Sequence, residues 1–167
     1  MDISIRLVRP EEHTALGDIT AQAYLGDGLL LLGTEDPYLT KLRDVGRRAA
    51  EAEVLVAVDG DGALLGGVTY TPPGNPWADI AGEGEAEFRM LAVAGEARGR
   101  GAGEALVRAC VERARATKGV TGLVLSTQDV MLGAHRIYRR LGFVRTPERD
   151  WEPVPGFGLL LAYRLAL

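Results

Sequence analysis

Cysteine is almost missing from this chain of 167 residues, and long apolar runs are missing too. The single cysteine, Cys110, can form no disulfide within the chain, so we expect a reducing, cytoplasmic setting. The longest strongly apolar run covers only residues 29–32, whereas a membrane span needs about 20 apolar residues. The first ten residues include Asp2 and lack a long apolar core, which is untypical of a secretory signal. We therefore expect no membrane partner.

Lysine and histidine are also scarce. The formal net charge is −4, which argues against a nucleic-acid partner because such partners usually need a basic surface. The two histidines, His13 and His135, have no companions at metal-ligand spacing, so we expect no metal site. The two lysines, Lys41 and Lys118, do not follow a glycine within a Gly-Lys-Ser/Thr motif, which excludes a Walker-type phosphate loop.

The sequence that remains is typical of one soluble α/β domain over residues 1–167, with 47% hydrophobic and 25% charged residues. Alternating apolar residues, turn residues and helix start signals predict the order β-α-α-β-β-β-α-β-α-β-β. The predicted strands cover residues 3–9, 53–58, 63–70, 85–93, 121–127, 143–145 and 158–165, and the predicted helices cover about 10–24, 37–50, 103–117 and 130–141.

Three alternating glycines stand where the strand over 85–93 gives way to the next helix. Gly99, Gly101 and Gly103 are interleaved with Arg98 and Arg100. Glycine lets the backbone turn sharply and direct successive N–H groups at one anion, and the helix N-terminus adds its positive dipole end. A dinucleotide fingerprint starting at Gly99 would need glycine where residue 104 is glutamate. The alternative is that these glycines only form a tight turn.

The glycine loop is one of two motifs that belong together, and the second follows it after one helix, one strand and part of another helix. Arg98, Gly101 and Gly103 match the Arg/Gln-x-x-Gly-x-Gly/Ala signature of the GNAT acetyltransferase superfamily. The second signature of that superfamily, Ala-x-x-x-Tyr-x-x-x-Gly-Phe, is matched by Ala134, Tyr138, Gly142 and Phe143. The chain resembles this superfamily over nearly its whole length. The resemblance implies a mixed, mostly antiparallel sheet of six to seven strands flanked by about four helices.

The resemblance also implies an activity and a cofactor. We expect an acetyl-CoA-dependent N-acetyltransferase that acts on a primary amine of a small molecule or peptide by direct attack in a ternary complex, without a metal. Many relatives carry asparagine where this chain has Met131, so that contact is lost or supplied by Ser126, Thr127 or Gln128. Arg100 is expected either to add charge at the pyrophosphate or to point to solvent. The residues that we expect to bind the cofactor are Leu91, Ala92, Val93, Arg98, Gly99, Arg100, Gly101, Ala102, Gly103, Ser126, Met131 and Ala134.

Two residues are predicted to carry the chemistry. Glu85 and Glu87 share one face of their strand, and the resemblance implies that Glu87 acts as the general base. It also implies that Tyr138 protonates the departing thiolate. The alternatives are a glutamate on a solvated face and a tyrosine that only packs in the core. The acidic stretch over residues 81–87 further suggests a cationic acceptor.

Other functions stay open at this point. A domain that binds acyl-CoA without catalysis, as a sensor would, could keep the same loop. The loop equally permits acyl transfer to oxygen or transfer of a longer acyl group, because it contacts the cofactor and not the acceptor. A homodimer is compatible with the sequence as well.

Overall fold

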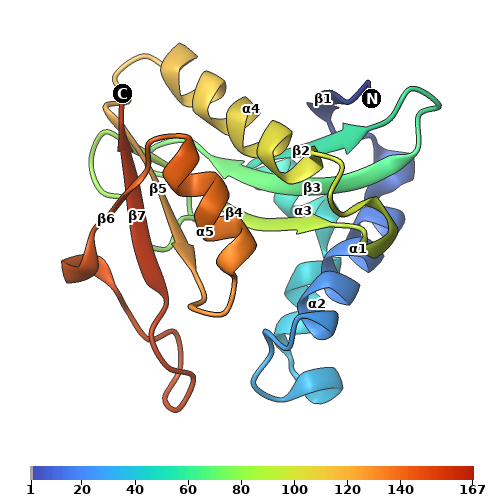
Figure 1. Cartoon of the computed structure of the whole chain (residues 1–167), viewed down its shortest axis with the longest axis horizontal. Coiled ribbons are helices and arrows are strands. Elements are labelled where there is room, and N and C mark those ends of the chain that lie inside the picture. The colour runs from blue at the N-terminus through green and yellow to red at the C-terminus, as the bar shows by residue number, and fades with distance from the viewer. Residues whose placement is uncertain (1) are drawn as a thin grey trace. The chain divides into compact units, whose positions relative to one another are not determined.

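The computed structural model describes residues 2–167, which form seven strands and five α-helices (Figure 1). The elements follow the predicted order, except that three helices instead of two precede the second strand. The strands are β1 (Ser4–Leu7), β2 (Glu53–Val58), β3 (Leu64–Thr71), β4 (Glu85–Val93), β5 (Gly122–Thr127), β6 (Val144–Arg145) and β7 (Leu161–Ala166), and the helices are α1 (His13–Gly26), α2 (Tyr38–Arg43), α3 (Val45–Glu51), α4 (Ala102–Ala116) and α5 (Leu132–Arg140).

The strands are ordered β1-β2-β3-β4-β5-β7-β6. β1 with β2, β2 with β3, β5 with β7 and β6 with β7 are antiparallel pairs, whereas β4 and β5 are parallel. The predicted mixed α/β fold is therefore confirmed. The contacts group the chain into two compact units, and both β4 and α4 run from one unit into the other.

The first unit contains the chain up to Tyr70 together with Met90–Ala109. Its core is built from Leu16 of α1, Val45 of α3, and Val54 and Val56 of β2, all of which are buried. Burial of each such side chain stabilises the fold by about 1.5 to 3 kcal/mol. A Cβ at Gly66 would overlap the carbonyl oxygen of Ala92, so glycine is what allows β3 to approach β4 this closely.

One predicted helix is wrong in its extent. The stretch over residues 37–50 forms two helices, α2 and α3, because Asp44 leaves the helical conformation at φ −83° and ψ 63°. The Asp44 carboxylate accepts a hydrogen bond of 3.2 Å from the amide of Arg47, and so caps α3. A preference for capping over helix continuation is common for aspartate. The helix predicted from Val130 likewise begins only at Leu132.

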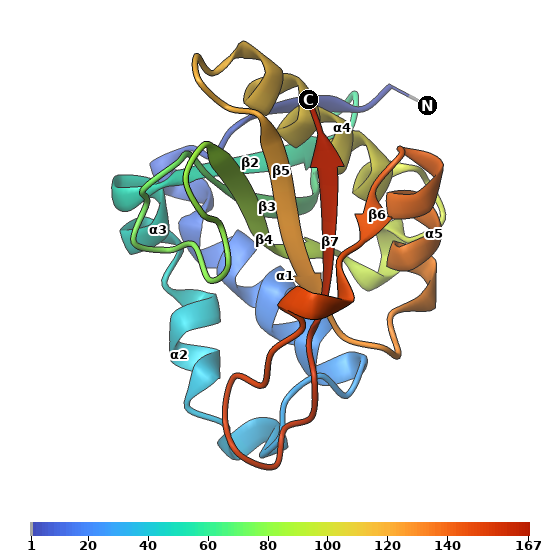
Figure 2. The same cartoon turned by 90° about the vertical axis from the view of Figure 1, so that its left-hand side faces the viewer.

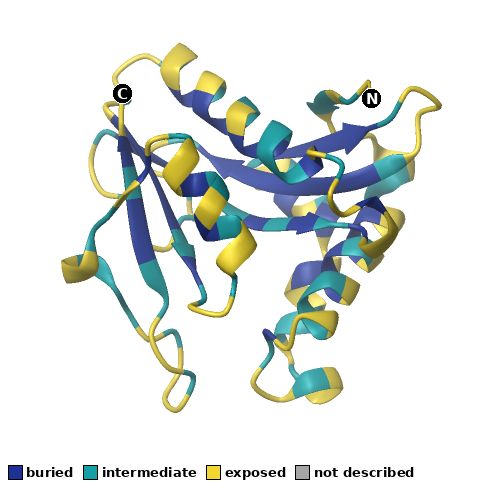
Figure 3. Cartoon of the chain, in the orientation of Figure 1, coloured by how far each residue is buried: buried dark blue, intermediate teal, exposed yellow. Residues whose placement is uncertain are grey.

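The second unit contains Thr71–Arg89 and Cys110–Leu167. Its central strand is β5, which pairs with β4 from Glu85↔Gly122 onward and with β7 from Gly122↔Ala166 onward (Figure 2). Figure 3 shows that these strands are largely buried, whereas α5 has an exposed outer side. That helix packs its Tyr138 ring against aromatic rings of β4 and β7. The second unit therefore has its own aromatic core.

Candidate functional site

The glycine loop of the first unit has the backbone conformation that its sequence predicts. Gly99 and Gly101 adopt φ values of 78° and 87°, a region that L side chains rarely enter. A Cβ at either position would have no neighbour within 4 Å, so the backbone conformation, and not a lack of space, requires glycine. α4 begins directly afterwards at Ala102, and Gly103 lies in its first turn.

This arrangement presents several donors to one region. The amide of Ala105 donates to the carbonyl of Gly101, which is the first intrahelical bond of α4. The earlier amides of the first turn have no partner within the helix, and the helix dipole makes this end partially positive. The loop is thus chemically suited to an anionic group such as a pyrophosphate.

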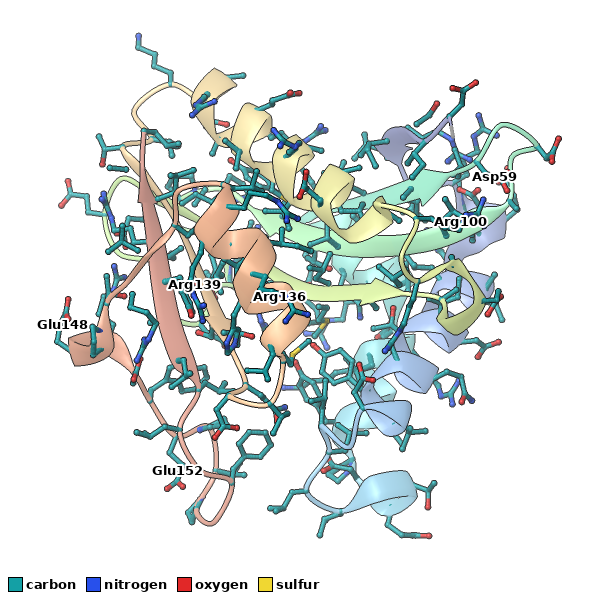
Figure 4. The ribbon with its side chains drawn as sticks, in the orientation of Figure 1. Asp59, Arg100, Arg136, Arg139, Glu148 and Glu152 are labelled. Carbon is teal, nitrogen blue, oxygen red and sulfur yellow. The ribbon has the colours of Figure 1, made fainter. Side chains whose placement is uncertain are left out.

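Both arginines of the loop are paired with carboxylates of the same unit. Arg98 donates from its two terminal nitrogens to the two carboxylate oxygens of Asp27, at 3.0 and 2.9 Å. Arg100 lies beside Asp59, with 3.9 Å between Nη2 and Oδ2 (Figure 4). The structure therefore places Arg100 next to a carboxylate of the turn between β2 and β3.

The end of β4 that leads to this loop is irregular. Met90 has a φ of 56°, which is uncommon for any residue other than glycine. The following residues alternate in burial, with Ala92 buried and Leu91 and Val93 half-buried. Such local distortions of strands are common near functional sites. The role of the backbone at Leu91–Val93 in cofactor binding remains a prediction.

Glu87 lies in the second unit and is fully buried. Its Oε1 accepts hydrogen bonds from three consecutive amides, those of Asp79, Ile80 and Ala81, at 2.9 to 3.0 Å. Its Oε2 is also buried and has no hydrogen-bond partner among residues 2–167. Burial raises the pKa of the Glu87 carboxyl, although the three amide donors oppose this effect. The solvated-face interpretation of Glu87 is therefore wrong.

The neighbouring charged residues of β4 bind the same loop, which precedes the strand. Arg89 donates to the carbonyl of Trp77 at 2.7 Å and pairs with Asp79 at 3.0 Å. Glu85 accepts from the amide of Gly82 at 2.9 Å. Glu85 and Glu87 bind this loop from the same face of the strand, as expected, and Arg89 binds it too. The loop over residues 77–82 is thus fixed by three side chains of β4.

The burial of two glutamates changes one expectation drawn from charge. The acidic stretch over residues 81–87 does not form an exposed anionic surface, because Glu85 and Glu87 are buried and only Glu83 is exposed. Arg149 and Arg164 also neutralise Glu85. The inference of a cationic acceptor from this stretch therefore loses its basis.

Tyr138 is almost fully buried in an aromatic cluster of the second unit. Its ring centroid lies 5.9 Å from those of Phe88 and Phe143 and 5.8 Å from that of Tyr163. Burial, with Cys110 and Tyr163 as lesser causes, raises the pKa of the Tyr138 phenol well above its usual value. The phenol is therefore protonated throughout the physiological pH range, and its ring is held in a fixed position.

The predicted cofactor residues at the end of β5 and the start of α5 have different neighbours. Ser126 accepts a hydrogen bond of 3.0 Å from the Trp151 indole nitrogen. The Thr127 hydroxyl lies 3.8 Å from the Met131 sulfur. His135, one turn into α5, lies 2.9 Å from the Gln128 carbonyl oxygen through Nε2. Ala134 is half-buried beside it.

The ion-pair partners of Arg98 and Glu85 were not predicted from the sequence. Asp27 lies 71 residues before Arg98, and Arg149 lies 64 residues after Glu85. The only available signal was opposite charge, which many other pairs in the chain share. The partners therefore emerge only from the fold.

Among the described residues, no group of three or more His, Cys, Asp or Glu side chains could hold a metal ion. No helix within residues 2–167 is long and apolar enough to cross a membrane.

Known proteins with similar sequences and folds point to one family. The sequence model described as "Acetyltransferase (GNAT) family" matches residues 23–143. A Schizosaccharomyces pombe protein named as an uncharacterized N-acetyltransferase is 30% identical over 157 residues, which cover 92% of this chain and 90% of that protein.

Solved structures agree in fold. A GCN5-related N-acetyltransferase from Kribbella flavida has a TM-score of 0.71 at 24% identity, with 99% of this chain and 98% of that chain covered. A phosphinothricin acetyltransferase from Sinorhizobium meliloti, solved in complex with acetyl-CoA, has a TM-score of 0.74 at 18% identity, with 100% and 89% covered. The family match covers most of the chain and includes both the glycine loop and the Tyr138 motif, so this protein belongs to the GNAT acetyltransferase family.

Proposed function

We propose that this protein is an acetyl-CoA-dependent N-acetyltransferase that acetylates a primary amine of a small molecule or peptide in a ternary complex. The observation that carries the proposal is the left-handed backbone of Gly99 and Gly101 directly before the N-terminus of α4, in a chain of the GNAT family. The Sinorhizobium meliloti acetyltransferase of similar fold was solved with acetyl-CoA, which supports the same co-substrate here.

The residues fit an anionic, extended co-substrate. The amides over residues 99–103 would hold its pyrophosphate, and the Arg98 guanidinium would add positive charge. The backbone groups of Leu91, Ala92 and Val93 would bind its pantetheine arm. Ser126, Met131 and Ala134 are the further residues that the family resemblance assigns to cofactor binding.

Acetyl transfer needs two proton movements, which we assign to Glu87 and Tyr138. The amine nitrogen attacks the thioester carbonyl carbon, so a C–N bond forms and the C–S bond breaks. Glu87 accepts the amine proton, directly or through water, because its Oε2 lacks a partner among the described residues and its pKa is raised. Tyr138 donates its phenolic proton to the departing thiolate, for which a protonated phenol is required.

A transfer assay tests this function. Purified protein would be incubated with acetyl-CoA and a panel of amines, amino acids, peptides and hydroxyl compounds, with thiol release and the mass of each acceptor as readouts. We expect an increase in mass by one acetyl group on an amine, above the hydrolysis seen without acceptor. Acetyl-CoA binding with no transfer would favour a sensory domain, and acetylation of hydroxyl compounds alone would favour an O-acyltransferase.

A further inference from the structure

Arg98, which the proposed function assigns to the cofactor pyrophosphate, is paired with Asp27 in the structure. We propose that Asp27 competes with acetyl-CoA for Arg98. To bind Arg98, the pyrophosphate must displace the Asp27 carboxylate from the guanidinium. This inference rests on the proposed function. It makes Asp27 a residue that sets cofactor affinity.

The geometry suits an exchangeable contact. Two parallel N–H···O bonds of 2.9 and 3.0 Å satisfy the same face of the guanidinium that a phosphate would use. The two side chains are 50% and 33% exposed, so an incoming anion can reach them. Exposed ion pairs contribute little free energy, so a pyrophosphate held by several amides can outweigh this one.

The position of Asp27 at the C-terminal end of α1 is a second reason why it competes with an anion for Arg98. Asp27 is the C-terminal cap of α1, and its amide donates to the carbonyl of Ala23 at 3.1 Å. A carboxylate is unfavourable at this end, because the helix dipole is negative there. The last turn of α1 contains no basic residue, so Arg98 supplies the compensating charge from another element. Withdrawal of Arg98 by an anion therefore leaves Asp27 uncompensated at the end of α1.

The surroundings leave room for this change. Asp27 and Arg98 both line a cavity of about 550 Å³ between α1 and the segment Ala94–Arg98.

Arg100 does not offer the same exchange. Its neighbour Asp59 also accepts from the amides of Asp61 and Ala63, at 2.9 and 3.0 Å. Removal of the Asp59 carboxylate would therefore disrupt the turn between β2 and β3. Asp27 is the better position at which to test competition for a loop arginine.

The test is a calorimetric titration with acetyl-CoA of the full-length protein and its Asp27→Asn variant. We expect Asp27→Asn to bind acetyl-CoA about two- to fivefold more tightly, the range that corresponds to loss of one competing surface ion pair. The matched control is Asp18→Asn, which removes the same charge from α1 but separates an ion pair with Arg43 of 2.6 Å. We expect that control to bind with the affinity of the unmodified protein.

An Arg98→Ala background separates competition from a general charge effect. If Asp27 acts through Arg98, the gain caused by Asp27→Asn disappears in that background. The inference is overturned if Asp27→Asn binds no more tightly than Asp18→Asn, if it binds more weakly, or if its gain persists without Arg98. Asp27→Ser serves as the second variant should the asparagine variant fail to fold. Absence of acetyl-CoA binding by the unmodified protein would overturn the proposed function as well, which distinguishes the two failures.

Discussion

The Arg149 guanidinium binds both carboxylate oxygens of Glu85, with N–O distances of 2.7 and 2.9 Å. Arg164 of β7 donates to the same carboxylate at 2.7 Å, and Arg149 also donates to the carbonyl of Ile80. This cluster joins the start of β4, the loop before it and β7 within the second unit. The arginines hold the pKa of Glu85 at about 2, mainly through the Arg149 hydrogen bonds.

Glu85→Gln should lower the free energy of unfolding by about 1 to 3 kcal/mol at pH 7, because two guanidinium groups lose their buried anionic partner. A lowered pKa in the folded state means that the carboxylate stabilises the fold above its ordinary pKa near 4.5 and loses this effect as the pH falls toward 2. Urea unfolding of both proteins between pH 7 and pH 2 measures the effect.

Glu83→Gln is the matched control, since Glu83 lies in the same acidic stretch and is exposed. It should change the unfolding free energy by less than about 0.5 kcal/mol. Glu85→Gln and the unmodified protein should have similar unfolding free energies at low pH. If the difference in unfolding free energy stays the same from pH 7 to pH 2, the role given to this carboxylate is contradicted.

Glu87→Gln should reduce kcat by about a hundredfold or more, because the amide cannot accept the amine proton. The Gln oxygen can still accept the three amides of residues 79–81, so the loop keeps its anchor. The raised pKa of Glu87 means that the rate falls as the pH drops through that pKa and the base becomes protonated. The measurement is the pH profile of kcat with an acceptor from the transfer assay.

In the glutamine variant the acidic limb of this profile should vanish. Glu87→Ala removes both the base and the anchor, so it should additionally lower the melting temperature. If the glutamine variant keeps full kcat and the same acidic limb, Glu87 is not the base and its carboxylate serves only the loop.

Tyr138→Phe should lower kcat about ten- to a hundredfold, while KM for acetyl-CoA and the melting temperature stay nearly constant. The ring contacts with Phe88, Phe143 and Tyr163 do not involve the hydroxyl. Steady-state kinetics at saturating acceptor gives both constants. Tyr163→Phe removes a hydroxyl from the same cluster and should leave kcat unchanged; equal losses in the two variants would exclude a specific role for Tyr138.

Local patterns predicted most of the fold and the position of the glycine loop. Two apolar runs on either side of the turn over residues 59–62 identified β2 and β3. Gly99 and Gly101 adopt a positive φ, which agrees with the sharp turn predicted there. The break at Asp44 was not predicted, because the apolar helical pattern continues through this position. The hydrogen bond from the Arg47 amide to the Asp44 carboxylate competes with continuation of the helix. A helix and a capped break are close in free energy at such positions.

The environment of the predicted site residues could not be predicted in the same way. Burial of Glu87 depends on the fold of a loop over residues 77–82, and that of Glu85 depends on Arg149 and Arg164, which are 64 and 79 residues away. A strand of alternating glutamates is equally compatible with a solvated face. Only long-range contacts decide between these outcomes.

Gly66→Ala should destabilise the protein by about 1 to 3 kcal/mol, because the new Cβ would overlap the Ala92 carbonyl oxygen and push β3 from β4. Gly60→Ala is the control, since no atom lies within 4 Å of a Cβ placed there. Urea unfolding of both variants makes the comparison. Equal stability of the two would mean that β3 and β4 can separate at little cost.

The most direct measurement is a calorimetric titration of the protein with acetyl-CoA, beside Gly101→Ala and the control Gly95→Ala. Alanine at Gly101 is strained at a φ of 87°, whereas Gly95 has no positive φ and no neighbour near a Cβ. We predict micromolar binding by the unmodified protein and by Gly95→Ala, with affinity about tenfold or more weaker for Gly101→Ala. Absence of binding by the unmodified protein would contradict the assignment of this loop to acetyl-CoA.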